Sequence, residues 1–199
     1  MPTEVAPIGF RPVGAADLPM LDRWMRQPHW REWWGVSEEE IRFVRDMIEG
    51  RDTTRPFIFS VDGEDVGFIQ YWFVRDHQND SWLADNPWLG VLPPQTIGID
   101  LSIGPADRLS QGIGTSVLRA FVALLRKTGF SEIIIDPDPA NLRAVRAYEK
   151  AGFRAISELL GRSGDSLIMR HETREPEPLA DSGHAGDKAD QRALHRRPT

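Results

Sequence analysis

Apolar and polar residues alternate most regularly in the middle of the chain, between Thr96 and Ile103. Successive side chains of a β-strand point to opposite faces, so this pattern predicts a strand with one apolar face and one polar face. The apolar positions are Ile97, Ile99, Leu101 and Ile103, and the polar face carries Gly98, Asp100 and Ser102.

Shorter apolar runs predict further strands. The first is Ile8–Val13, and Pro56–Val61 and Val66–Val74 are expected to pair as a hairpin around an Asp-Gly-Glu-Asp turn. Ile133–Ile135 is apolar without alternation, which predicts a short strand covered on both faces. Arg75–Gln95, with several Asp, Asn and Pro residues and two tryptophans, is interpreted as a long loop.

Apolar residues at helical spacing predict helices at Ala16–Arg26, Ser37–Ile48 and Gly112–Lys127. Ser37 is expected to cap the second helix, with Glu40 three residues later completing a capping box. The third helix is expected to bury the stripe Val117, Leu118, Phe121, Leu124 and Leu125.

The last elements follow from turn chemistry. Asp138 and Pro139 predict the N-cap and first turn of a helix over residues 138–151. Phe153–Leu160 and Ser166–Arg170 are then expected to close the chain as a hairpin. This order of strands and helices predicts a mixed α/β fold.

Composition sets the class of protein. With 199 residues, 40% hydrophobic and 27% charged, the chain is typical of one globular domain, which we place at residues 1–171. Residues 172–199 lack aromatic side chains and are rich in Pro, Asp, Gly and Ala, so we expect a disordered tail. No apolar stretch approaches the roughly 20 residues of a membrane span, and the start of the chain lacks the pattern of a secretory signal. These features favour a cytoplasmic protein that does not bind a membrane.

The net charge and the cysteine and histidine content exclude several classes of partner and site. The net charge of −6 disfavours nucleic acid as a partner and favours cationic ones. The absence of cysteine excludes disulfides and a thiol nucleophile, and the five histidines have no metal-ligand spacing, so we assign no metal.

The pair Gly112 and Gly114 opens a helix shortly after the central strand. Without Cβ atoms such a turn can present successive backbone N–H groups to a phosphate, and the helix dipole adds to the attraction. A strand-to-helix turn of no further consequence would also contain glycine. The turn is therefore a candidate phosphate site, formed by Gln111, Gly112, Ile113, Gly114 and Thr115.

Three segments together resemble the Gcn5-related N-acetyltransferase (GNAT) superfamily, over about residues 8–170. They are the alternating strand, the Gln-Gly-Ile-Gly turn with its helix, and the segment Ile135-Asp-Pro-Asp-Pro-Ala-Asn-Leu-Arg-Ala-Val-Arg-Ala-Tyr-Glu-Lys-Ala-Gly-Phe153. Within the superfamily the chain is similar to the bacterial aminoglycoside 6′-N-acetyltransferases. The shared features are Glu32-Trp33-Trp34-Gly35, the loop around Trp82, Gly98-Ile99-Asp100, and the segment from Asp136-Pro137 to Tyr148.

The resemblance implies a fold, a donor and an acceptor. The fold is a central, mostly antiparallel sheet, splayed at the cofactor cleft and flanked by helices on both faces. The donor is acetyl-CoA and the acceptor is a primary amine on a cationic sugar, the 6′-amine of an aminoglycoside in first place. Because the chain has no cysteine, we expect direct attack in a ternary complex and not an acyl-enzyme, in a monomer or weak homodimer.

Two carboxylates and a phenol are the catalytic candidates. Asp100 lies on the polar face of the central strand, where it can hold an ammonium group and accept its proton. Asp136 ends a strand, at the edge where ligand crevices open, and the resemblance implies that it binds a substrate ammonium and shares the work of the base. Tyr148 is implied to protonate the departing thiolate. The alternatives are a solvated strand aspartate, a turn aspartate and a core tyrosine.

The remaining site residues follow from the resemblance. Leu101, Ser102 and Ile103 would pair with the pantetheine arm through main-chain groups, and Asn141 would hydrogen-bond its amides unless it only serves the first helical turn. Trp34 and Trp82 match positions that stack on sugar rings, although a packing role for Trp82 is as plausible. We interpret Asp138 as structural, and the other tryptophans as packing residues, namely Trp24, Trp30, Trp33, Trp72 and Trp88.

Other functions stay open at this point. A siderophore-biosynthesis N-acyltransferase shares the Trp-Trp segment and the Asp-Pro-Asp element, but such relatives tend to carry histidine at the position of Asp100 and lack the Tyr148 equivalent. A peptide or polyamine N-acetyltransferase fits the tryptophan-rich loop less well. A non-catalytic CoA- or drug-binding module would not need Asp100, Asp136 and Tyr148 intact.

Overall fold

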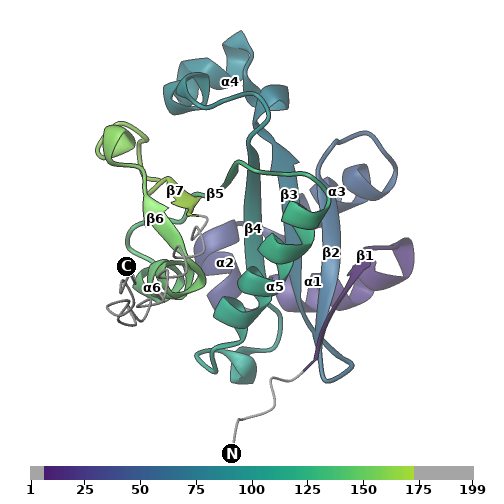
Figure 1. Ribbon diagram of the computed structural model, residues 1–199. Helices are drawn as coiled ribbons and strands as arrows, with labels where there is room; N and C mark the ends of the chain where they lie inside the picture. Colours follow the sequence, from purple (N-terminus) through teal and green to yellow (C-terminus); the bar gives the residue numbers. More distant parts are fainter. Residues whose placement is uncertain (1–6, 173–199) are drawn as a thin grey trace, which may run out of the picture.

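The computed structural model describes residues 7–172, which form one seven-stranded sheet with helices on both faces (Figure 1). The strand order is β1-β2-β3-β4-β5-β7-β6, and every neighbouring pair is antiparallel except β4 and β5. The mixed α/β prediction is confirmed. The strands are β1 (Ile8–Pro12), β2 (Arg55–Val61), β3 (Glu64–Phe73), β4 (Ile97–Ile103), β5 (Ile133–Ile135), β6 (Phe153–Ala155) and β7 (Met169–His171).

The helices divide between the two faces of the sheet. They are α1 (Leu18–Met25), α2 (Pro28–Trp34), α3 (Ser37–Ile48), α4 (Asp80–Asp85), α5 (Ile113–Lys127) and α6 (Leu142–Ala151). In one core, α1, α2 and α3 pack on Ile58 and Phe68 of the sheet. In the other, α5 and α6 pack on residues such as Phe59 and Ile99. No helix within residues 7–172 is both long and apolar enough to cross a bilayer.

The hairpin of β2 and β3 forms where the sequence predicts it. Asp62 and Gly63 both have positive φ, 53° and 79°, and Val61↔Glu64 is the pair of the ladder next to the turn. Two consecutive left-handed residues make the two-residue turn whose twist suits a hairpin, and Asp-Gly is a favoured pair for it. The turn is therefore two residues shorter than the four predicted.

The pairing of β4 with β5 is short and decides where the sheet opens. These parallel strands pair only at Ile97↔Ile133 and Gly98↔Ile134. Asp100 and Asp136 each lie two residues beyond the last pair, Gly98↔Ile134. Because side chains alternate between faces, both aspartates point to the same face of the sheet. Had the ladder continued, these two aspartates would be direct neighbours. Instead the strands diverge, as the expected splayed sheet requires.

Two helix predictions near the N-terminal half need correction. The sequence pattern predicts no helix or strand at residues 27–36, but Pro28–Trp34 form α2, with proline in its first turn. Ser37 is the first helical residue of α3 and not its N-cap, which is Val36. The Ser37 hydroxyl donates to the Glu38 carboxylate at 3.1 Å, so the predicted capping box with Glu40 does not form.

Three further expectations change. Arg75–Gln95 is not an irregular loop, because it contains α4, capped by Asn79, and two 3-10 turns. Leu124 is 39% exposed, and Val122 takes its place in the buried stripe of α5. The closing hairpin is confirmed but reduced to three residue pairs between β6 and β7.

The start of α6 also lies later than predicted. Asp138 accepts a hydrogen bond from the Ala140 N–H at 2.7 Å, and its carbonyl accepts from the Asn141 N–H at 2.9 Å. These bonds make a turn around Pro139. The N-cap of α6 is Asn141, whose Oδ1 accepts from the Ala144 N–H at 3.1 Å. Residues 173–199 of the predicted tail lie outside the described residues.

Candidate functional site

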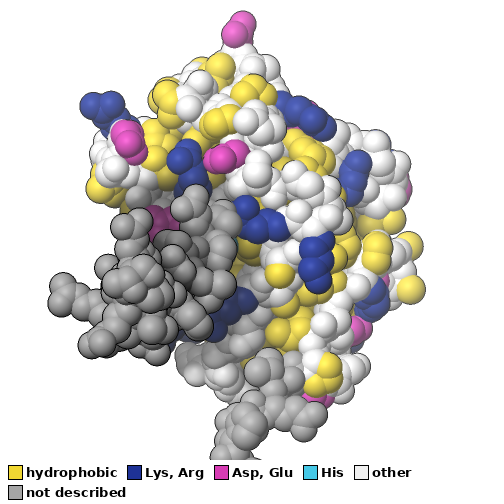
Figure 2. Space-filling view, in the orientation of Figure 1, with side chains coloured by type: hydrophobic (Ala, Val, Ile, Leu, Met, Phe, Trp, Pro, Cys, Tyr) yellow, Lys and Arg dark blue, Asp and Glu magenta, His cyan; other side chains and the backbone are white. Residues whose placement is uncertain are grey.

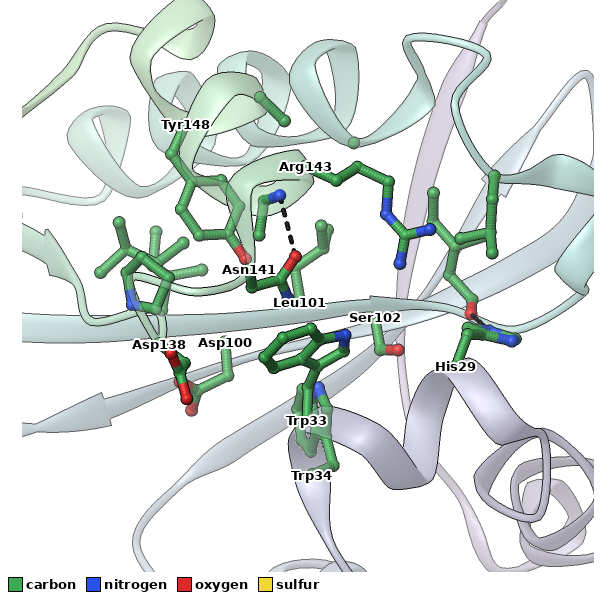
Figure 3. Close-up of a pocket in the computed structure, with 18 of the residues that line it drawn as sticks. His29, Trp33, Trp34, Asp100, Leu101, Ser102, Asp138, Asn141, Arg143 and Tyr148 are labelled. Carbon is green, nitrogen blue, oxygen red and sulfur yellow. Dashed lines mark hydrogen bonds between the residues drawn. The ribbon is translucent and has the colours of Figure 1, made fainter. Parts of the chain in front are cut away.

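A cavity of about 420 Å³ lies at the point where β4 and β5 diverge. Both faces of β4 line it, since Ile99 and Leu101 belong to the α5 side while Asp100 and Ser102 belong to the other. In Figure 3, Tyr148, Asn141 and Arg143 lie on one side of the β4 ribbon, and Asp100, Trp33, Trp34 and His29 lie on the other. The cavity therefore passes through the gap in the sheet.

This gap brings together residues from opposite layers. Tyr148 is 8% exposed and belongs to the apolar core beneath α5 and α6, yet it lines the same cavity as Asp100 and Asp136. In a continuous sheet a side chain of that core would not reach the polar face of β4. The three catalytic candidates from the sequence thus share one site.

Asp100 is held in place by its neighbour on β3. Gln70 pairs with Asp100 in the β3–β4 ladder, and its Nε2 donates to Asp100 Oδ2 at 2.9 Å. Burial raises the pKa of the Asp100 carboxyl, and the hydrogen bond from Gln70 lowers it in part. A carboxylate in this setting is a stronger proton acceptor than one in water.

Burial and neighbouring charges also raise the pKa of Asp136 and of Tyr148. Burial raises the pKa of Asp136 well above its usual range, and the nearby charge of Asp100 raises it further. Burial also raises the pKa of the Tyr148 phenol, and the charges of Asp100 and Asp136 add to this. The phenol therefore keeps its proton at neutral pH and can donate it.

Glu40 is a further carboxylate in the cavity lining, supplied by α3. Burial raises its pKa from 4.5 to about 7, and the charges of Asp100 and Glu39 contribute. Within residues 7–172 no ion pair includes Glu40. The sequence analysis missed this residue as a site candidate, because the pattern assigned it to a helix cap.

The N-terminus of α5 forms another part of the cavity. Gly112 is its N-cap with φ of 80°, and Ser110 two residues earlier has φ of 61°, a strained value for a residue other than glycine. No side chain caps this helix, and its first backbone hydrogen bond runs from Ser116 N–H to the Gly112 carbonyl. The preceding N–H groups at this end are the ones that can hold a phosphate.

Gly114 tests whether this turn fits a ligand. A Cβ built there would meet only Leu101 Cδ2, at 3.6 Å, an ordinary contact, and its φ is not positive. Neither packing nor backbone conformation within the chain therefore requires glycine at this position. Glycine leaves room for a ligand to approach the backbone closely, which fits a bound pyrophosphate.

The other predicted donor-binding residues divide into two groups. Ile113 and Thr115 line the cavity, and the Thr115 hydroxyl donates to the Ala147 carbonyl at 3.2 Å. Gln111 does not line the cavity, and its side chain donates to the Asp107 carbonyl at 2.6 Å. The remaining members, Leu101, Ser102, Ile103 and Asn141, all line it.

The tryptophans take different places. Trp34 lines the cavity as predicted, and so does Trp33, which the sequence analysis interpreted as packing. Trp82 lies on α4, is 48% exposed and does not line the cavity. Its ring contacts His77 at a centroid distance of 4.6 Å, and a substrate role for it stays a prediction. The packing interpretation fits the tryptophans with buried rings, Trp24, Trp30 and Trp88, and also Trp72, whose ring lies against Gly98.

The lining also includes polar side chains that the sequence did not single out as site residues, among them His29, Glu40, Gln70 and Arg143. His29 Nε2 is 2.9 Å from the Ile103 carbonyl, and its Nδ1 is buried without a hydrogen-bond partner among the described residues. The pairing of Gln70 with Asp100 would have required the strand register. Within residues 7–172, no three or more His, Asp and Glu side chains gather as a metal-binding group.

Charge is unevenly distributed along the cavity. The side chains that line it include four carboxylates but one guanidinium, that of Arg143. In Figure 3, Arg143 extends toward the side of His29, and Asp100 lies at the other end. The site thus has an acidic end and an end with cationic and N–H groups. On the outer face seen in Figure 2, Lys and Arg side chains stand apart among apolar and uncharged ones.

Comparison with known proteins identifies the type of domain. The family described as acetyltransferase (GNAT) domain matches residues 14–159. The aminoglycoside N(6′)-acetyltransferase type 1 of Klebsiella pneumoniae is 34% identical over 161 residues, which cover 77% of each chain. The lysine N-acyltransferase MbtK of Mycobacterium sp. (strain MCS) is 29% identical over 165 residues, 79% of this chain and 64% of the relative.

A solved structure extends the comparison to three dimensions. The aminoglycoside acetyltransferase AAC(6′)-Ib in complex with coenzyme A and kanamycin superposes with a TM-score of 0.67 at 30% identity. The match covers 84% of this chain and 95% of that one. The match therefore extends over most of this chain.

Proposed function

Because the chain belongs to the GNAT acetyltransferase family, we propose that it transfers the acetyl group of acetyl-CoA to a primary amine of an aminoglycoside. The 6′-amine is the proposed acceptor, from the activity that the similar enzymes' names state. One observation carries the proposal. A phenol from one face of the sheet and two carboxylates from the other share a cavity whose wall includes an uncapped helix N-terminus.

The donor is proposed to bind at the end of the cavity formed by α5. Its pyrophosphate would lie against the backbone N–H groups of Ile113, Gly114 and Thr115, where the helix dipole favours negative charge. The pantetheine arm would extend along Leu101–Ile103, which has no strand partner on the β5 side. Bound there, acetyl-CoA supplies the reactive thioester.

The acidic end is proposed to hold the acceptor. An ammonium group is attracted by Asp100 and Asp136 and must lose a proton before its nitrogen can attack. The raised pKa of both carboxyls suits them to accept that proton, directly or through water. The new bond joins the amine nitrogen to the acetyl carbon, and the bond from that carbon to sulfur breaks.

Tyr148 is proposed to complete the transfer. Its phenol gives a proton to the departing thiolate, which leaves as free CoA. Direct attack in a ternary complex fits a chain that has no cysteine to carry the acetyl group. The ammonium loses two protons in total: one restores the Tyr148 phenol and the other leaves to solvent, so the products are the acetylated amine, CoA and one proton.

The first experiment measures CoA release with a thiol-reactive dye, in mixtures of the protein, acetyl-CoA and kanamycin. Prompt release that depends on kanamycin supports the proposal. Kanamycin binding by calorimetry without thiol release contradicts it and indicates a sequestering module. A panel of amines, including peptides and simple polyamines, then defines the acceptor.

Similarity to the lysine N-acyltransferase supports one alternative, acyl transfer in siderophore biosynthesis. Comparing acetyl-CoA with a long-chain acyl-CoA, and kanamycin with a lysine derivative, separates the two. We further propose a cytoplasmic location, where acetyl-CoA is available, and a monomer or weak homodimer without nucleic-acid partners. Light scattering over a concentration series tests the oligomeric state.

A further inference from the structure

The acidic end of the cavity contains more negative charge than acceptance of one proton requires. Asp100 comes from β4, Asp136 follows β5 and Glu40 comes from α3. At the moment of attack the acceptor amine is neutral and one carboxyl has taken its proton, so the other carboxylates have no counter-ion from that amine. Buried carboxylates without a cation are unfavourable, and a second positive group is needed to keep them ionised.

Glu40 and Gln70 approach Asp100 from the same side of the sheet. Phe68, two residues before Gln70 on β3, packs in the core under α1, α2 and α3, so Gln70 points to the face that α3 covers. Glu40 on α3 lines the cavity there and is close enough for the charge of Asp100 to act on it.

Gln70 supplies an acceptor atom without a partner. Its Nε2 is used by Asp100, which fixes the orientation of the amide and leaves Oε1 as a hydrogen-bond acceptor. Oε1 is buried and has no partner among residues 7–172. An unpaired buried acceptor destabilises the free protein, and a donor on a ligand would satisfy it.

Arg143 does not meet this need. It is the guanidinium of the lining, but it extends toward the His29 side of the cavity in Figure 3, away from Asp100. The charge of His77 also acts on Asp100, but His77 does not line the cavity. Among the residues of the lining no cation faces the acidic end, so a ligand would supply it.

Resting on the proposed function, we propose that Glu40 and Gln70 form a subsite for a second ammonium group of the acceptor, one that is not acetylated. This group remains charged throughout the reaction and hydrogen-bonds to Glu40 and to Gln70 Oε1. Glu40 is thus a specificity residue that selects acceptors with at least two amines over monoamines.

The test compares two acceptors in Glu40→Gln. Kanamycin carries several amines, and 6-amino-6-deoxyglucose carries one. We expect kcat/KM for kanamycin to fall about tenfold or more, mainly through KM, as for a lost charge-assisted hydrogen bond. For the monoamine we expect a change of less than about twofold. Equal loss for both acceptors, or no loss for kanamycin, would overturn the proposal.

Two further variants sharpen the result. Glu39→Gln removes an exposed carboxylate one residue away that does not line the cavity. Its charge makes the smallest of the contributions to the Glu40 pKa, so kcat/KM should change by less than about twofold for either acceptor. Glu40→Asp keeps the charge and should recover part of the affinity for kanamycin.

Calorimetry separates this proposal from the proposed function. Kanamycin should bind Glu40→Gln and Gln70→Leu about tenfold or more weakly than wild type, whether or not acetyl transfer occurs. If the wild type releases no CoA with any amine, the proposed function fails and the calorimetric comparison still decides on Glu40. Absence of kanamycin binding to the wild type would overturn both.

Discussion

The sheet has two halves that are built differently. β1 to β4 pair in antiparallel ladders of five to seven residue pairs, while each pairing from β4 onward has two or three. The long ladders are packed on both sides by apolar side chains. The short ones leave a gap, and the carboxylates lie at its border. Where backbone pairing ends early, space becomes available for ligands.

The two halves also differ in the space that they leave around glycine residues. Gly67 in the paired half has no room for a side chain, because a Cβ would lie 2.1 Å from the Phe59 ring and 2.6 Å from the Ser102 carbonyl oxygen. Gly114 beside the gap has room. Glycine thus serves packing in one half and, in our proposal, ligand access in the other.

The largest effect is expected from the carboxylate on β4. Asp100→Asn keeps the shape of the side chain and removes the proton acceptor, so kcat should fall about 10²- to 10⁴-fold. CoA affinity by calorimetry should stay within about twofold, since the donor end is separate. Asp85→Asn, an exposed change on α4, is the control. Equal loss of turnover and CoA affinity would refute the role of base.

Tyr148→Phe removes the proposed acid from the other side of the gap. We expect kcat to fall about 10²-fold with KM for the amine nearly unchanged, because only the proton for the leaving thiolate is lost. The variant should fold, since the ring and its contact with Phe153 remain. Full activity of Tyr148→Phe would show that Tyr148 is a core residue with no role in catalysis.

The two glycines should respond in opposite ways. Gly114→Ala should weaken CoA binding about tenfold, while the melting temperature stays equal or rises, because alanine favours a helix. Gly67→Ala should lower stability by about 1–3 kcal/mol through overpacking, measured by denaturant unfolding. If Gly114→Ala leaves CoA affinity unchanged, the phosphate position is wrong.

The pH dependence of kcat/KM tests the charges in the gap. The base acts when ionised, so the rate falls as pH decreases through the raised pKa of Asp100 and Asp136. We expect this acid limb above the pH at which a free aspartate titrates, near 3.9 on model peptides. In Asp100→Asn, the limb that remains should shift to lower pH, because the charge that raised the Asp136 pKa is gone. If the acid limb of the profile does not shift in Asp100→Asn, it reports the pKa of a group other than Asp136.

The smallest effect concerns stability. The folded protein holds the Glu40 proton more tightly than the unfolded chain does, with a pKa of about 7 against 4.5. Stability therefore declines as pH rises from about 4.5 to 7 on account of this group. Glu40→Gln should raise the melting temperature at pH 8 by about 2–4 °C, the shift for roughly 1 kcal/mol at this size, and by little at pH 4. An equal gain at both values would exclude titration as the cause.

Much of the fold follows from periodicity alone. The alternation in β4 gives its two faces correctly, because each second residue enters the core under α5. The gap could not be predicted in this way, since it depends on two strands 36 residues apart in register, Gly98 and Ile134. Asp100 and Asp136 were found by their strand positions and by resemblance, and not from their proximity.

Glu40 was not predicted as a site residue because the start of α3 was expected one residue too late. The expected cap placed Ser37 outside α3, which made Glu40 the third helical residue and the partner of the cap. The helix begins one residue earlier, so that position falls to Glu39, and Glu40 faces the cavity instead. Local hydrogen bonding of this kind depends on tertiary packing, which a single sequence does not contain.

The divergence of β4 from β5 also creates a sheet edge in the interior of the domain. Beyond Gly98 the main chain of β4 is unpaired on that side, and exposed strand edges commonly recruit other chains and lead to aggregation. Here residues of α2 and α6 line the cavity at this edge and cover it in part. In our proposal the pantetheine arm of the donor lies along this open strand, so the same feature that could recruit another chain serves as a binding site.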